Sequence, residues 1–183
     1  MNILGFHGTN QKFDQFDQRH ARITQDFYGG GILYVTDNLG IAKNYAKQAV
    51  KRAGGLEIIY KVRLNLNKVF DVNKIYTGRN LIVLIGSNAD QFARSANLMP
   101  IGVDKFKVLS DLRNGNLELT GEQVFRGMSR GMINTANARD MLIRNHYDGL
   151  RYNGGMNMRQ AINHNVYIAY KQQSITIVGI NQS

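Results

Sequence analysis

The sequence predicts an α+β fold with mainly antiparallel sheets, in a single domain spanning residues 1–183. Short apolar stretches typical of strands lie near both ends of the chain, and segments with helical periodicity lie between them. The chain has 183 residues, 43% of them hydrophobic, which is enough for one compact core. Its 19 glycines and single proline mark turns, and no Pro- or Ser-rich stretch indicates a linker between domains.

Two short apolar runs near the N-terminus predict strands. Residues 3–6 form an opening strand that ends at His7-Gly8-Thr9. The run 32–35 follows Gly29-Gly30-Gly31 and predicts a second strand, because a few apolar residues bounded by turn signals are typical of a buried strand.

A helix and a long strand follow. Thr36-Asp37-Asn38 is a helix start signal, after which apolar residues recur at helical spacing over residues 41–50 until Gly54-Gly55 ends the pattern. Residues 56–64 alternate between apolar and charged side chains, which predicts a long, half-buried strand.

The second half of the chain is less periodic. Residues 81–85 are compatible with a strand or a helix, residues 91–97 predict a helix, and another short helix opens at Thr120. Asn134 or Thr135 caps a further helix over residues 138–145. Three strands end the chain: one from the turn Tyr147-Asp148-Gly149-Leu150, one over residues 166–170 and one over residues 175–180.

Composition excludes several classes of protein. The chain has no cysteine, which excludes disulfide scaffolds and thiolate chemistry and fits a reducing, cytoplasmic location. Its longest apolar run, residues 81–85, is far shorter than the roughly 20 residues that span a bilayer, and no secretory signal is expected. We therefore expect a cytoplasmic protein without a membrane partner.

The net charge of +10 is compatible with nucleic acid as a partner. The densest basic group is Lys43, Lys47, Lys51 and Arg52, for which the sequence favours a solvated helix face.

The usual catalytic motifs are absent from the sequence, and the four histidines are too scattered to predict a metal site. What stands out is His7-Gly8-Thr9 at a strand end, together with Tyr34 on the next strand and Tyr45 eleven residues later. These residues occur in the segments Gly31-Ile32-Leu33-Tyr34-Val35-Thr36-Asp37 and Asn44-Tyr45-Ala46.

In these segments the sequence resembles the ADP-ribosyltransferase superfamily, in the diphtheria-toxin and poly(ADP-ribose) polymerase branch named for its His-Tyr-Glu triad. The order and spacing match apart from one extra residue between Gly31 and Tyr34. Tyr147-Asp148-Gly149-Leu150 and residues 166–175 resemble the closing hairpin of that family, and similar segments recur in small phage-encoded transferases. The resemblance implies a split, two-sheet core and, for a phage protein, a location in the host cytoplasm.

The resemblance implies that NAD is the substrate and that no metal is needed. By resemblance His7 hydrogen-bonds a ribose hydroxyl, the Gly8 main chain holds the carboxamide, and Tyr34 and Tyr45 stack on the nicotinamide ring. Such stacking competes with core packing as the role of Tyr45, which lies on the apolar side of its predicted helix. Thr9, in the same motif, and Arg22, in the following loop, complete the implied NAD-binding set.

The triad glutamate is replaced by Val166. Bond cleavage builds positive charge on the ribose, which a carboxylate would stabilise. Asp148 is one candidate replacement, although an Asp-Gly turn is the favoured role, and Asn165 takes the triad position if the alignment shifts by one residue.

We therefore expect a mono-ADP-ribosyltransferase acting on a macromolecule, preferably a host protein and otherwise nucleic acid. Two alternatives stay open. One is an inactive binding or inhibitory protein with the same fold, and the other is a basic nucleic-acid-binding domain unrelated to NAD.

Overall fold

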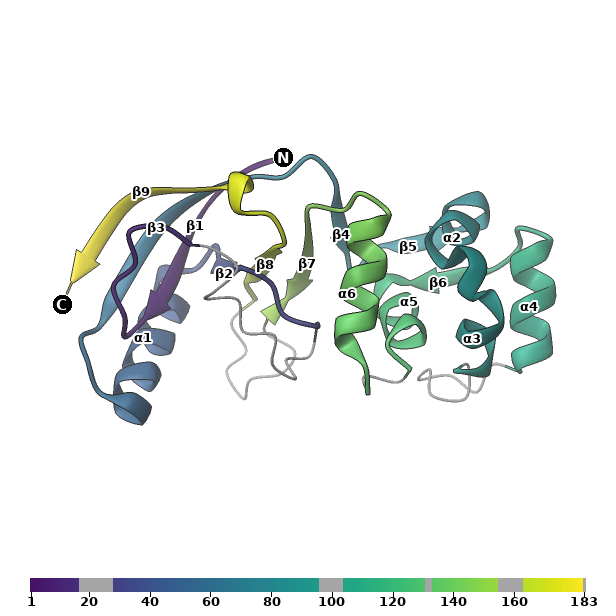
Figure 1. The fold of residues 1–183 in the computed structure, drawn as a ribbon, viewed down its shortest axis with the longest axis horizontal. Helices are drawn as coiled ribbons and strands as arrows, with labels where there is room; N and C mark the ends of the chain where they lie inside the picture. Colours follow the sequence, from purple (N-terminus) through teal and green to yellow (C-terminus); the bar gives the residue numbers. More distant parts are fainter. Residues whose placement is uncertain (17–27, 96–103, 131–132, 155–162, 183) are drawn as a thin grey trace. The chain divides into compact units, whose positions relative to one another are not determined.

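The structure is a computed structural model that describes residues 1–16, 28–95, 104–130, 133–154 and 163–182. Within these ranges it has the predicted α+β composition, with a mostly antiparallel seven-stranded sheet in the order β4-β7-β8-β2-β1-β3-β9 and a two-stranded sheet of β5 and β6 (Figure 1). The strands are β1 Asn2–Thr9, β2 Leu33–Thr36, β3 Ile58–Asn65, β4 Val69–Asp71, β5 Ile75–Thr77, β6 Glu118–Thr120, β7 Gly149–Asn153, β8 Asn165–Ala169 and β9 Ile175–Gln182.

Six α-helices are described, with two short 3₁₀ helices. The α-helices are α1 Leu39–Ala53, α2 Gly78–Ile85, α3 Ala89–Arg94, α4 Lys105–Arg113, α5 Gly121–Met128 and α6 Thr135–Arg144, and the 3₁₀ helices are η2 Gly86–Asn88 and η5 Gln172–Ser174. The segment 81–85, which the sequence left open between strand and helix, is therefore helical.

The chain folds into two compact units. Unit 1 comprises Met1–Arg22, Gly31–Val69 and Asp148–Ser183, and unit 2 comprises Ile23–Gly30 and Phe70–Tyr147. Unit 1 contains α1 and the long strands, whereas unit 2 contains the other α-helices and the small sheet. The single domain expected over residues 1–183 stays a prediction.

Strand β3 organises the larger sheet in unit 1. Its Tyr60, Val62 and Leu64 are fully buried while Lys61 and Arg63 are exposed, as the alternation predicted. β1 pairs with β3 along its whole length, from Asn2 opposite Asn65 to Thr9 opposite Ile58. Burial of one face of β3 therefore sets which face each residue of β1 occupies.

Strands β1 and β2 are joined at a single position. Their one register pair is Phe6 opposite Thr36, whereas β2 pairs with β8 at four successive positions and β1 pairs with β3 at eight. We call this junction the seam. On one side of it lie β1, β3 and β9, and on the other lie β2, β8, β7 and β4.

Helix α1 begins and ends where the sequence predicted. The side chain of Asn38 accepts a hydrogen bond from the Ile41 amide at 3.1 Å, and Gly54, with φ of 71°, ends the helix. Ala42 and Ala46 are fully buried and pack with Phe6 and Ile59. This packing places α1 on the face of β1 and β3 that Phe6 and Ile59 share.

Gly8 allows this close packing. A Cβ atom added at Gly8 would lie 1.8 Å from the Ala42 carbonyl oxygen and 2.9 Å from the Ala46 amide nitrogen. Both atoms belong to the helix backbone, which has no flexible end to move aside. Glycine at this position is therefore a packing requirement, whatever other role it has.

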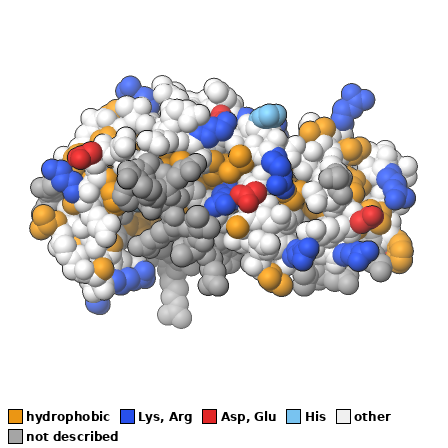
Figure 2. Space-filling model, viewed as in Figure 1, with side chains coloured by type: hydrophobic (Ala, Val, Ile, Leu, Met, Phe, Trp, Pro, Cys, Tyr) orange, Lys and Arg blue, Asp and Glu red, His pale blue; other side chains and the backbone are white. Residues whose placement is uncertain are grey.

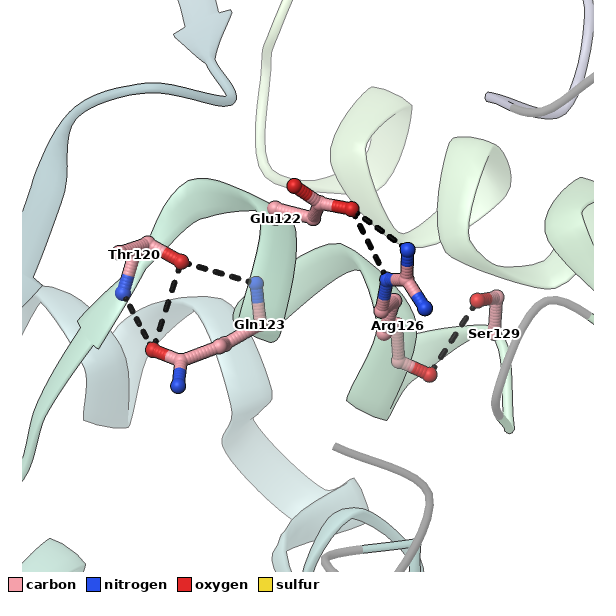
Figure 3. A network of polar contacts seen from close by, with 5 residues as sticks. All are labelled: Thr120, Glu122, Gln123, Arg126 and Ser129. Atoms are coloured by element: carbon pink, nitrogen blue, oxygen red, sulfur yellow. Dashed lines mark hydrogen bonds and ion pairs between the residues drawn. The ribbon is translucent and has the colours of Figure 1, made fainter. Parts of the chain in front are cut away.

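In unit 2, helix α5 has a complete capping box (Figure 3). The Thr120 hydroxyl accepts a hydrogen bond from the Gln123 amide, and the Gln123 side chain accepts one from the Thr120 amide. One turn along, Arg126 donates two hydrogen bonds to Glu122, at 3.0 and 2.7 Å. The short helix that the sequence predicted at Thr120 is confirmed.

The segments that resemble the family's closing hairpin, residues 147–150 and 166–175, lie in or next to β7, β8 and β9, and β7 and β8 pair in antiparallel fashion. β8 pairs with β2 and β7, whereas β9 pairs with β3 at the far edge of the sheet. The short helix η5 lies between β8 and β9, which are not neighbours in the sheet.

Replacing Gly8 with Ala is expected to destabilise the fold by about 3 kcal/mol or more, because the methyl group overlaps the α1 backbone. Urea unfolding monitored by circular dichroism measures the change. Gly179→Ala in β9 is the control, because its added Cβ would meet only the Lys61 Cβ at 3.6 Å, an ordinary contact. Equal stability of the two variants would contradict the close packing of α1 on β1.

Candidate functional site

His7 lies at the seam and is held by the neighbouring strand. Its Nδ1 lies 2.8 Å from the Tyr34 carbonyl oxygen, and its ring meets Phe16 edge to face at a centroid distance of 5.4 Å. A carbonyl can only accept, so Nδ1 carries a hydrogen and Nε2 is the acceptor nitrogen of the neutral ring. The hydrogen bond to Tyr34 and the contact with Phe16 therefore fix the orientation of the imidazole at the point where β1 and β2 stop pairing.

Tyr34 lies in the middle of β2, opposite Ile168 of β8. Its neighbours Leu33 and Val35 belong to the main core cluster, so alternation places Tyr34 on the other face, with Thr36 and the helix α1. The residue is half-buried. Tyr34 is thus a partly accessible aromatic residue on the α1 face of the sheet.

Tyr45 is exposed, although it lies beside the buried residues of α1. Its exposed fraction is 39%, whereas its neighbour Ala46 is fully buried. Core packing, the competing role for Tyr45, therefore accounts for only part of its surface. The rest of its surface is exposed.

The strand registers do not place all three predicted side chains on one face. Tyr34 and α1, which carries Tyr45, share a face, whereas His7 is opposite Tyr60 and alternates onto the main core cluster's face. What joins His7 to the tyrosines is its hydrogen bond to the main chain of Tyr34. The seam is therefore the feature that connects the candidate residues.

Thr9 and Arg22 complete the sequence-predicted NAD-binding set. The Thr9 hydroxyl oxygen accepts a hydrogen bond from the Gln11 amide at 3.3 Å, a local turn contact just beyond β1. Arg22 lies outside the described residues.

Val166 occupies β8 opposite Thr36 and is buried. Because Tyr34 is opposite Ile168, two residues further along β8, Val166 and Tyr34 lie diagonally on the same face. The position that the resemblance assigns to the triad glutamate is therefore beside Tyr34, and an isopropyl group fills it.

Asn165 is held between two charged residues. Its side-chain nitrogen donates to Asp37 at 2.7 Å, its main-chain nitrogen donates to Asp37 at 2.9 Å, and its side-chain oxygen accepts two hydrogen bonds from Arg151, at 2.9 and 3.1 Å. These contacts connect the residue after β2, the first residue of β8 and the middle of β7. Sequence reasoning missed Asp37 and Arg151 as parts of this network, because 128 and 14 residues respectively separate them from Asn165.

Asp148 is a structural clamp in the described contacts. It is buried, and its carboxylate accepts hydrogen bonds from the main-chain nitrogens of Asn67 and Lys68 and from the Lys171 ammonium group. Burial by itself would raise the pKa of Asp148, but the hydrogen bonds from Lys171, Asn67 and Lys68 outweigh it and lower the pKa. These contacts agree with the turn role that the sequence favoured.

Among the described residues, no group of three or more His, Asp and Glu side chains is placed to hold a metal ion. In the same part of the chain, no helix is both long and apolar enough to cross a membrane.

Comparison with known proteins found no family model, no curated protein and no solved structure that matches the chain. The functional argument therefore depends on the residues and their geometry.

Replacing Asp148 with Asn is expected to lower the free energy of unfolding by about 2 kcal/mol at neutral pH, because hydrogen bonds to a charged acceptor are lost. The folded-state pKa of Asp148 is below its ordinary value of 3.8, so the ionised group stabilises the fold above that pH. This contribution is lost as the pH falls through the lowered pKa. Urea unfolding of both proteins across acidic and neutral pH should show the difference shrinking below about pH 4.

Asp111→Asn is the matched control. Asp111 forms an exposed ion pair with Lys107 in α4, and loss of such a pair costs at most about 0.5 kcal/mol. Equal effects of the two substitutions, or no dependence on pH for Asp148→Asn, would contradict the clamp.

Proposed function

We propose that the protein is an ADP-ribosyltransferase that moves one ADP-ribose unit from NAD to a macromolecular acceptor. The observation that carries the proposal is the hydrogen bond from His7 to the Tyr34 carbonyl at the seam. It joins two residues of the motif that resembles the family, and it holds the imidazole at the point where the two halves of the sheet part. The split, two-sheet core implied by the resemblance is part of this proposal.

In the proposed complex, nicotinamide lies between the rings of Tyr34 and Tyr45, and the attached ribose lies at the seam, where His7 is bonded to the main chain of Tyr34. Both tyrosines belong to the α1 side of the sheet, and each has accessible surface. Their rings supply flat faces for a planar pyridinium group, a contact strengthened by its positive charge. By resemblance, the main chain of Gly8 holds the carboxamide.

His7 orients the ribose. With a hydrogen on Nδ1 donated to Tyr34, Nε2 accepts from a ribose hydroxyl. The bond between the ribose C1′ and the nicotinamide nitrogen then breaks and its electron pair stays with nicotinamide, which leaves as a neutral ring. The acceptor's nucleophile bonds to C1′ and loses its proton, if it carries one, to solvent. Positioning, more than acid–base chemistry, is the contribution of these residues.

Val166 limits what the site can do. An apolar side chain beside Tyr34 supplies no negative charge to the developing ribose cation, so repeated transfer to build a chain is not expected. A protein carboxylate is the acceptor that best replaces the missing charge, which favours a host protein. The same valine favours the second candidate, a protein that binds NAD without turnover.

Transfer of radiolabel from NAD to a cell lysate tests the proposal. The unmodified protein should label a discrete band, and His7→Ala should reduce labelling at least about a hundredfold, because orientation of the reacting ribose is lost. Tyr45→Ala should weaken NAD binding about tenfold, whereas Tyr45→Phe keeps the aromatic face and should bind normally. Isothermal titration calorimetry measures the binding.

The control is His146→Ala, which removes an exposed histidine from unit 2. If the unmodified protein binds NAD but transfers no label, the transferase proposal is wrong and the second candidate, a protein that binds NAD without turnover, is favoured. Absence of NAD binding would exclude both.

A further inference from the structure

Positive charge is concentrated in unit 1. It carries 13 Lys and Arg against five Asp and Glu, whereas unit 2 carries ten against eight, so the net charges are +8 and +2. The space-filling view shows Lys and Arg side chains spread over the visible face with few acidic groups between them (Figure 2). The residues of unit 1 that carry this excess of positive charge are therefore the place to look for a binding surface.

Helix α1 carries the densest part of this charge. Lys43, Lys47 and Lys51 are all exposed, and their spacing of four residues places them in one row about 12 Å long. Arg52 is exposed beside the last of them. The helix contains no acidic residue over its 15 positions.

Helix stability does not explain this row. Lys51 and Arg52 are favourable in the last turn, but like charges four residues apart repel and cost about 0.2–0.5 kcal/mol per pair. In two helices of unit 2, residues four positions apart carry opposite charges and attract each other. Lys107 pairs with Asp111 in α4 and Glu122 pairs with Arg126 in α5, each at 2.7 Å.

Strand β3 adds two more cations on the same face of the sheet. Lys61 and Arg63 are exposed and alternate with the buried Tyr60, Val62 and Leu64. Ile59, on the same face as Lys61 and Arg63, packs against α1. We call Lys43, Lys47, Lys51, Arg52, Lys61 and Arg63 the α1–β3 basic surface.

We propose that the α1–β3 basic surface binds the phosphate backbone of a nucleic acid. A row of ammonium groups fits a polymer that carries a regular line of negative charge. The exposed residues between the lysines are Asn44, Tyr45 and Gln48. Asn44 and Gln48 can donate hydrogen bonds to phosphate or sugar, and the ring of Tyr45 offers a flat face on which a base can stack. Binding through phosphates is independent of sequence and decreases steeply with salt.

Fluorescence anisotropy with a labelled single-stranded DNA of about 20 nucleotides tests the proposal in the absence of NAD. Unmodified protein should bind with an affinity that falls linearly against the logarithm of the salt concentration. The triple variant Lys43→Gln, Lys47→Gln, Lys51→Gln should bind at least about tenfold more weakly near 0.1 M salt, and the salt slope should fall by about 2, because three phosphate contacts are lost.

The matched control is Arg79→Gln, Arg94→Gln, Arg113→Gln. It removes the same charge from exposed positions in α2, α3 and α4, and it should leave affinity and slope almost unchanged. Circular dichroism confirms that both triple variants are folded. Equal losses in the two variants, or no DNA binding by the unmodified protein, would overturn the proposal.

Two further measurements separate this surface from other interpretations. Polyglutamate that binds as tightly as DNA, with the same loss in the lysine variant, would assign the surface to acidic proteins and overturn the nucleic-acid proposal. His7→Ala should bind DNA normally, because His7 is on the opposite face of the sheet. Loss of NAD transfer and loss of DNA binding are therefore distinguishable.

Discussion

The contact between Gly8 and the backbone of α1 is the constraint on which the candidate site depends. Because no side chain separates β1 from the helix, the turn that contains Ala42 and Ala46 lies directly against the strand. That approach sets the position of Tyr45, one residue before Ala46, and of the lysine row on the outer side of the same helix. The absence of a Cβ atom at Gly8 therefore determines where α1 places both Tyr45, the proposed NAD-stacking residue, and the proposed phosphate-binding surface.

The break in pairing at the seam explains why His7 bonds to the main chain of β2. Continuous pairing between β1 and β2 would satisfy the Tyr34 carbonyl through a main-chain donor, as the other strands of the sheet do. Where pairing stops after Phe6 and Thr36, the imidazole bonds to that carbonyl instead. A side chain used in this way is rigid, and rigidity is what a group that orients a substrate needs. On the other side of the seam, the Asp37–Asn165–Arg151 network ties together β2, β8 and β7, so both borders of the seam are well defined.

Local signals in the sequence predicted the local structure of unit 1 well. The Asn38 cap, the Gly54 stop and the alternation along β3 each depend on neighbouring residues, and each is confirmed. Contacts between distant residues left no such signal. The Asp148 clamp joins residues about 80 positions apart, and β9 pairs with β3, more than a hundred residues earlier in the chain. β4, β5 and β6 have three residues each, too few to show a period. Of the candidate site, the sequence predicted residue types and spacing, but it did not predict that His7 and Tyr34 occupy opposite faces of the sheet.

The position of β9 has a consequence for synthesis of the chain. β3 is complete at Asn65, yet its outer partner is not made until residues 175–182, after the whole of residues 70–147 has been added. During translation, the edge of β3 that pairs with β9 therefore stays unpaired while more than a hundred further residues are added, and most of unit 2 is already available to fold. The exposed basic residues Lys61 and Arg63 lie on β3 itself and disfavour pairing of its free edge with other nascent chains. The same cations that form a binding surface in the finished protein thus protect an unfinished sheet from aggregation.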